Sequence, residues 1–304
     1  MQLPFRLLGA GLLFAAIMQF DLRHDLFWGW TPPLREGDID RSLSPAALGD
    51  DLPPGWRVGA AWHVAPGALA ASGWSGLDIA PDGQLVILSD LGIGVEMEPP
   101  APDQRRARLV RFPLTAIGWP SDAEAIAIDR DRLVVTFEGY ARLLVRDAQV
   151  EHLEPLPGFA DDNRGAEAMF AARNSFYVIG EDGERALRFA GGRFEPVAIT
   201  GTSLMPTGAA RWPGRDDGLL LERGISIFGL RATVARLEVA EGGLLVSDPQ
   251  PLGLGILDNA EGIAISAAAD DGYHVWLVTD DNGRAPQRTL LVRYDVPPDG
   301  WPFG

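Results

Sequence analysis

Apolar residues alternate with polar or small ones in short runs along most of this chain, and from about residue 56 onward almost no 3.6-residue period occurs. Turn-forming Gly, Pro, Asn and Asp residues bound these runs, as expected for β-strands. One pattern returns repeatedly: a strand that opens with an acid or a small residue, a tight turn, and a second strand that ends in an acid. It occupies residues 75–90, 122–138, 165–182, 206–223 and 259–282.

Antiparallel pairing offers a test of this pattern, because partners across a hairpin have residue numbers with a constant sum. Glu124 and Glu138 have their midpoint at residue 131, inside the turn sequence DRDR. Glu167 and Glu181 have theirs at residue 174, inside ARNS. The same reasoning centres three more pairs near their turns: Asp78 with Asp90, Gly208 with Glu222, and Glu261 with Asp280. We therefore expect these residues at the open ends of five hairpins.

Each hairpin is followed by one or two further strands, which gives repeating units of about 35–50 residues. Such units are typical of propeller blades. The pattern predicts an all-β fold, a β-propeller of five to six blades with three to four antiparallel strands each. A sixth blade would combine the 56–66 strand with residues 240–256. A pair of β-sandwiches and a β-helix are the alternatives.

The N-terminal segment has a different composition. Arg6 precedes an apolar run over residues 7–18, the length of a signal-peptide core and short of the roughly 20 residues of a full span. No clear A-x-A cleavage site follows, so an uncleaved anchor and a buried helix of a cytosolic protein are alternatives. We expect a signal peptide or membrane anchor at 1–20, a linker at 21–55 and the propeller domain at 56–304. The expected location is periplasmic or extracellular, with anchoring to the inner membrane as a variant.

Composition excludes several classes of function. A net charge of −16 disfavours nucleic acid as a partner. The absence of Cys excludes thiol catalysis, Cys-ligated zinc and disulfides. The four His residues do not fall at strand ends of the repeat, which disfavours a His-rich zinc site. All 26 basic residues are Arg, which suggests a bacterial genome rich in GC.

In a propeller, the expected hairpin ends meet at one mouth of the central channel. Carboxylates gathered there repel one another unless cations or arginines neutralise them. Hard oxygen donors in such number suit Ca²⁺, with Mg²⁺ or Mn²⁺ less favoured. The acids expected at this mouth are Asp78, Asp90, Asp122, Glu124, Glu138, Glu167, Glu181, Asp182, Glu222, Glu261, Asp280 and Asp281.

Arginines stand beside the same motifs, namely Arg164, Arg185, Arg223 and Arg284. Their planar, forked side chains suit phosphate or carboxylate groups of a substrate. The alternative is that acids and arginines pair as salt bridges between blades. Ser75, in GWSGL, lacks the G-x-S-x-G pattern of a hydrolase nucleophile, and we expect it to bond to the backbone.

An ordered set of motifs resembles a known family. The motifs are SGLDIAPDGQLVILSDLG, DAEAIAI followed by LVVTFEG, DNRGAEAM followed by FYVIGEDG, and DNAEGIAI followed by VWLVTDDN. Over residues 56–298 the chain resembles the bacterial phytase-like domain described as "esterase-like activity of phytase". The resemblance implies a β-propeller, export, and a calcium-dependent phosphoester or ester hydrolase. It implies mouth positions for Glu124, Glu138, Glu167, Glu181 and Glu261. β-Propeller phytases use several lysines around the phosphate, and their absence here puts phytate itself in doubt.

These observations predict an exported, monomeric, phytase-like or esterase-like hydrolase that acts on a small anionic phosphate or carboxylic ester. Glu138 or Glu181 is the expected catalytic base. Arg164, Arg223 and Arg284 are expected to bind the substrate, and the expected calcium ligands are Asp78, Glu124, Glu167, Glu261 and Asp280. A lactonase-type calcium propeller and a non-catalytic binding propeller are the alternatives.

Overall fold

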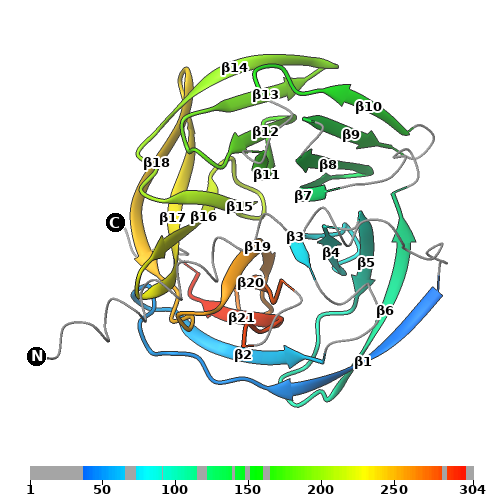
Figure 1. Ribbon diagram of the computed structural model, residues 1–304, viewed down its shortest axis with the longest axis vertical. Helices are drawn as coiled ribbons and strands as arrows, with labels where there is room; N and C mark the ends of the chain where they lie inside the picture. Colours follow the sequence, from blue (N-terminus) through cyan, green and yellow to red (C-terminus); the bar gives the residue numbers. More distant parts are fainter. Residues whose placement is uncertain are drawn as a thin grey trace, which may run out of the picture.

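The computed structural model describes residues 37–65, 73–90, 92–114, 122–138, 141–147, 151–159, 165–282 and 286–298. Five strands stand side by side around a central axis, each against the next, and the fifth returns to the first (Figure 1). Together they close a ring, so the described part of the chain is a β-propeller of five blades. The ring strands are β3 (Trp74–Ile79), β7 (Asp122–Asp129), β11 (Ala166–Ala172), β15 (Met205–Arg211) and β19 (Asn259–Ala267).

Each ring strand is the innermost strand of an antiparallel four-stranded blade, and three further strands follow it outward. Blade one adds β4 (Leu85–Ser89), β5 (Ile93–Met97) and β6 (Arg106–Pro113). Blade two adds β8 (Arg132–Glu138), β9 (Arg142–Arg146) and β10 (Glu151–Pro155). Blade three adds β12 (Ser175–Gly180), β13 (Ala186–Ala190) and β14 (Arg193–Thr200). Blade four adds β16 (Gly218–Ser226), β17 (Gly229–Ala240) and β18 (Gly243–Pro251). Blade five adds β20 (Tyr273–Asp280), β21 (Leu290–Val296) and β2 (Arg57–Val64).

Strand β2 closes the ring, because it comes from the N-terminal side of the sequence and pairs antiparallel with β21 near the C-terminus. The two segments considered for a sixth blade are therefore already used: β2 completes blade five and β18 completes blade four. Strand β1 (Gly37–Pro45) pairs with β2 and β6 and connects blades five and one along the rim. It lies within the 21–55 segment predicted as linker, so that part of the prediction is wrong: its residues satisfy their backbone hydrogen bonds in the sheet. Residues 1–20 lie outside the described part.

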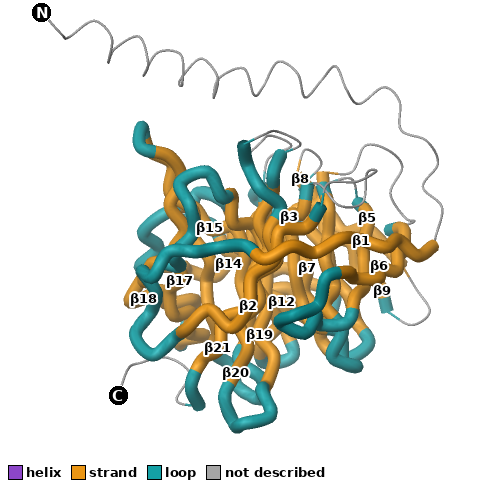
Figure 2. Tube along the Cα trace, turned by 90° about the horizontal axis from the view of Figure 1, so that it is seen from below, coloured by secondary structure: helices purple, strands orange, loops and turns teal. Residues whose placement is uncertain are grey.

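The core is divided into five clusters of buried apolar residues, and each cluster lies between two neighbouring blades. Between blades five and one, for example, the rings of Trp62 and Trp276 stack at 6.4 Å and pack with Trp74 and Leu77. Seen from the side, the strands fill the space between two loop-covered faces (Figure 2). The described residues form no helix long and apolar enough to cross a membrane.

Asp78 is one of the polar ties between blades. It pairs with Val86, close to the turn of the first hairpin, and not at the open end where the midpoint test placed it. Its carboxylate accepts hydrogen bonds from the backbone N–H of Ile79 at 2.7 Å and, across the blade boundary, of Ile128 at 2.6 Å. Burial raises the pKa of this carboxyl to about 7. Asp78 therefore joins blades one and two and is no mouth ligand.

The raised pKa predicts how stability depends on pH. The folded chain binds the Asp78 proton more tightly than the unfolded chain, so the free energy of unfolding falls as pH rises from about 4 to about 7. We expect the melting temperature to fall between pH 5 and pH 8, and to fall less in Asp78→Asn, which keeps one accepting oxygen but does not ionise. Differential scanning calorimetry measures both. The exposed Asp131→Asn is the control and should behave as the parent; an unaltered slope in Asp78→Asn contradicts this role.

Candidate functional site

Every ring strand carries one extra residue at the same level, close to its open end. The register between the first and second strands shifts there in all five blades, which is the signature of a β-bulge. A bulge bends the strand and re-aims its side chain, and here the re-aimed positions surround the axis. The bulge residues are Ser75, Glu124, Glu167, Thr207 and Glu261.

These registers correct two sequence-based assignments. Ser75, not Asp78, is the blade-one counterpart of the three bulge glutamates. In blade four the counterpart is Thr207, not Gly208. The midpoint test missed both, because it compared acids and disregarded the bulge. A usable signal was present in the sequence, since the bulge residue is followed by Gly or Ala in each repeat: WSG, AEA, AEA, PTG and AEG.

A second set of positions lies one step nearer the mouth, on the second strand of each blade or directly after it. In blades two, four and five these residues pair with the first residue of the ring strand. In blades one and three they come one residue after the last paired residue of the second strand, and their backbone N–H bonds to the residue before the ring strand. Four of them are acids, and blade four alone supplies a base. They are Asp90, Glu138, Glu181, Arg223 and Asp280.

Arg223 is the cation around which the mouth glutamates gather. Its Nη1 donates to a carboxylate oxygen of Glu261 and, at 2.6 Å, to Oδ1 of Asn259. The amide nitrogen of Asn259 in turn donates to Glu261. Its Nη2 lies 3.9 Å from Oε1 of Glu181. Burial alone disfavours the charged guanidinium, but the negative charges of Glu261, Glu167, Glu181 and Glu124 outweigh it and raise the pKa of Arg223. The site is therefore a positive side chain ringed by acids from three other blades.

The acids of this site differ in exposure. Glu167 is buried, Glu124 is partly buried, and the side chain of Glu181 is 25% exposed. Burial raises the pKa of Glu261, against the opposing effect of Arg223 and Asn259. Of the two acids paired with Arg223, Glu181 is thus the more accessible, because the side chain of Glu261 is only 14% exposed.

Asp280 lies at the edge of the cluster and has a structural partner. Its Oδ1 accepts a hydrogen bond from the backbone N–H of Gly73 at 2.9 Å, which ties blade five to blade one. Only 3% of the residue is exposed, and burial raises its pKa to about 7, with Glu261 adding to the shift. Like Asp78, it connects blades.

Glu222 is buried and faces a loop, not the mouth. It accepts hydrogen bonds from the backbone N–H of Ser203 at 2.7 Å and of Leu204 at 3.1 Å. The neighbouring acid of blade three, Asp182, bonds to Arg185 at 2.6 Å. Sequence reasoning placed both with the mouth acids, but their oxygens are committed to local partners.

Of three other predicted site residues, the structure describes only Glu138, and only its backbone. Glu138 ends β8 opposite Asp122, which puts its backbone at the mouth. Arg164 and Arg284 lie outside the described residues. Asn259 was not predicted; it opens the fifth ring strand, and the DNAEG sequence gives no indication of its bond to Arg223.

Below the bulge residues the central channel is closed. The cavity on the axis has a volume of about 10 Å³ and is lined by the bulge residues Ser75, Glu167, Thr207 and Glu261 with their neighbours. That is the volume of about one water probe. A ligand of this site must therefore lie on the mouth and not in a tunnel.

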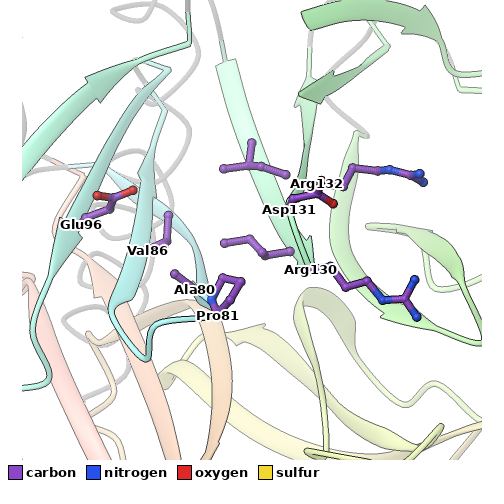
Figure 3. A pocket seen from close by; sticks show the side chains of 9 residues that line it. Ala80, Pro81, Val86, Glu96, Arg130, Asp131 and Arg132 are labelled. Carbon is purple, nitrogen blue, oxygen red and sulfur yellow. The ribbon is translucent and has the colours of Figure 1, made fainter. Parts of the chain in front are cut away.

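A larger hollow of about 670 Å³ lies at the opposite ends of the hairpins of blades one and two. Ala80, Val86 and Leu133 line it, and the side chains of Arg130 and Arg132 extend away from Glu96 (Figure 3). Arg130 bonds to Asn174, and the guanidinium of Arg132 lies over the ring of Phe176. Few polar groups converge there, so the mouth is the candidate site.

The part of the chain that contains the mouth motifs matches a known protein family. The family described as "Phytase-like: Esterase-like activity of phytase" matches residues 70–283, from just before β3 to just after β20. The chain belongs to this phytase-like family. No curated protein sequence matches it.

Solved structures similar to this phytase-like chain include glutaminyl cyclase from Myxococcus xanthus, at 13% identity and a TM-score of 0.45, over 79% of this chain and 97% of that one. The PQQ-bound aldose sugar dehydrogenase from Streptomyces coelicolor is 12% identical, with a TM-score of 0.45, over 88% of this chain and all of that one. These likenesses are distant, and the roles of individual residues rest on the geometry above.

The central ion pair of the phytase-like mouth predicts a large effect on stability. Arg223→Met leaves Glu261, whose side chain is only 14% exposed, without its cation. Removing one partner of a buried pair costs about 3–5 kcal/mol, and the lower end of this range is expected for this partly buried one. We expect such a loss from urea denaturation, and a smaller one from Glu261→Gln.

The double variant should lose less than the sum of the two single losses, because each single change already removes the pair. Arg231→Met, an exposed arginine on the same hairpin, is the control and should stay within about 0.5 kcal/mol of the parent. Additive losses would contradict the pairing.

Proposed function

We propose that this chain is an ester hydrolase that works on the mouth of the propeller. The observation that carries the proposal is the convergence of partly buried glutamates from blades two, three and five on Arg223, above a closed channel. Carboxylates that crowd together repel one another, and clusters of this kind occur preferentially at functional sites. Membership of a family described by esterase-like activity supports the same reaction class.

Glu181 is proposed as the general base. It is the more accessible of the two acids paired with Arg223, and its distance of 3.9 Å from Arg223 lets the guanidinium orient the carboxylate without a tight ion pair. A water placed against Glu181 loses a proton to the carboxylate as its oxygen attacks the carbonyl carbon or phosphorus of the ester. The bond to the leaving alcohol breaks, and the departing oxygen takes up a proton. Glu138, at the same position of blade two, is the second candidate for this role.

Arg223 is proposed to orient the base and to stabilise negative charge that develops on the substrate. Its Nη1 is committed to Asn259 and Glu261, so the part directed at Glu181 is the part available for this purpose. Arg164 and Arg284 are proposed as further anion-binding residues, since both flank mouth motifs in the sequence.

A calcium ion is proposed as a cofactor, since an anionic ester approaches a mouth rich in carboxylates more readily beside a cation. The donors fit a hard cation, because they are oxygens without His or Cys. Glu124 and Glu167, on adjacent blades, would hold it. Asp78 and Asp280 are not proposed as ligands, since their oxygens join blades.

Among the described residues no three acids or histidines are spaced to hold a metal by themselves, so water or substrate would complete the coordination. Bound there, calcium would polarise the ester oxygen.

The proposed substrate is a small anionic phosphate or carboxylic ester, and the protein is proposed to act as a monomer after export to the periplasm or the cell exterior. Phytate itself is not proposed, because the chain has no lysine to surround several phosphates.

Activity tests the proposed base. The protein is assayed with p-nitrophenyl phosphate, p-nitrophenyl acetate and a γ-lactone, and the compound that it hydrolyses identifies the class of its substrate. With that compound, Glu181→Gln should lower kcat by about 100-fold or more. Glu195→Gln, a glutamate on the outer strand β14 of the same blade, should retain full activity. If Glu181→Gln remains as active as Glu195→Gln, Glu181 is not the base.

Calcium binding is tested separately from activity. At a concentration of 100 Kd, calcium stabilises a single-site protein by about 2.7 kcal/mol, so the melting temperature should rise by about 5 °C or more. The rise should vanish in Glu124→Gln/Glu167→Gln and persist in Glu195→Gln. An equal rise in all three proteins would place the calcium elsewhere.

A further inference from the structure

The hairpin of β16 and β17 in blade four continues past the mouth cluster. Ser226 pairs with Gly229, so the turn consists of Ile227 and Phe228. These two side chains are 73% and 78% exposed, the highest values among the large apolar residues described. Two of the largest apolar side chains therefore occupy the most exposed position of the hairpin.

The turn itself does not require them. Two-residue hairpin loops favour Asn, Asp and Gly, whose backbones adopt the needed conformations at little cost. Here the positive φ of 115° falls on Gly229, after the loop, which leaves the two loop positions open to polar residues. Folding alone gives no reason for Ile and Phe at this place.

The apolar surface extends to the neighbouring turn before β19. The backbone N–H of Leu230 donates to the carbonyl oxygen of Ile256 at 2.7 Å, which joins the two turns. Contiguous exposed apolar surface usually marks a site of interaction. The tip patch comprises Ile225, Ile227, Phe228, Ile256 and Leu257, which are 41–78% exposed.

The part of this hairpin between Glu222 and Glu238 differs in charge from the rest of the protein. Residues 223–237 contain three arginines and no acid, in a chain of net charge −16. Arg231 is exposed and pairs with Gly224, directly below the tip. Large apolar side chains at a tip with arginine behind them match a lipid surface, whose acyl region lies below phosphate groups.

The described part of the chain begins on the same face. Strand β1 begins at Gly37, opposite Arg111, near the end of β6 that pairs with Ile93 beside the mouth. Thirty-six residues precede this point, and they include the apolar run at 7–18. The segment that carries this run therefore joins the described chain on the mouth side of the propeller.

We propose that the tip patch inserts into the interface of a lipid bilayer and holds the mouth toward the membrane surface. Ile227 and Phe228 enter the acyl region, Ile256 and Leu257 follow at its edge, and Arg231 meets the phosphate groups. The acidic remainder of the protein is repelled by anionic lipid, so insertion is strongest in zwitterionic bilayers.

The chain has no cysteine, so a single substituted cysteine can be labelled with an environment-sensitive nitrobenzoxadiazole dye. The full chain carries the dye at Ile227→Cys or, as control, at Leu245→Cys, which is 41% exposed on the outer strand β18. With phosphatidylcholine vesicles, the dye at position 227 should brighten by at least about two-fold, as expected for insertion below the headgroups. Nitroxide-labelled lipid should quench it, and the dye at position 245 should not respond.

Two outcomes overturn the proposal. If the protein floats with the vesicles while neither dye responds, only the N-terminal segment binds lipid. If the dye at position 227 brightens with protein concentration in the absence of vesicles, the tip patch binds a second copy of the chain.

A vesicle flotation experiment distinguishes lipid binding by the N-terminal apolar run from lipid binding by the tip patch. Leu12→Arg/Leu13→Arg disables the N-terminal run in the full chain, and the remaining flotation should fall several-fold when Ile227→Ser/Phe228→Ser is added. Circular dichroism verifies the fold of each variant. Equal flotation with and without the tip substitutions would also overturn the proposal.

Discussion

The close approach of the five ring strands at the axis is the constraint from which the rest of the site follows. A side chain on Gly262 would place its Cβ 2.8 Å from the backbone nitrogen of Leu77, and one on Gly208 would lie 3.0 Å from the carbonyl oxygen of Glu261. Both distances are too short for ordinary contacts, so the residue after the bulge must be Gly in blades four and five. In blades two and three this position is Ala, and the ring strands there leave room for one methyl group. The same proximity closes the channel. Any ligand is therefore confined to the mouth, where the bulges direct their side chains.

The bulge position serves either the scaffold or the site, depending on its residue. Where it is a hydroxyl residue, it bonds to the next blade: Ser75 donates to the carbonyl oxygen of Ala123 at 2.5 Å, and Thr207 to that of Ala260 at 2.9 Å. In blade two the bulge residue is Glu124, and Thr136 of the second strand supplies the equivalent bond to Ala166 at 2.7 Å. The scaffold compensates for the acid there. Acids that need such compensation are better explained by function than by folding.

Much of this architecture could be predicted from the sequence. Alternating runs and turn signals predicted the hairpins, their repetition predicted the propeller, and Glu124, Glu167 and Glu261 were correctly grouped. Asp78 was misplaced because the comparison used residue numbers alone. It lies three residues after the bulge residue Ser75, near the turn, and residue numbers do not distinguish this position from the open end of the hairpin. The contact of Arg223 with Asn259 and Glu261 could not be predicted, because it crosses between blades and depends on how the ring closes.

Blade four differs from the other blades in two features, and both involve strand β16. It supplies the arginine of the mouth, and its hairpin extends to the exposed tip patch. Strand β16 is continuous from Gly218 to Ser226, so at about 3.3 Å per residue its end lies about 10 Å from Arg223, and the turn of Ile227 and Phe228 lies just beyond. A paired two-stranded ribbon of this length transmits orientation well, since its ladder continues from Arg223 to Ser226. Whatever the tip contacts therefore also fixes the direction in which the mouth around Arg223 faces.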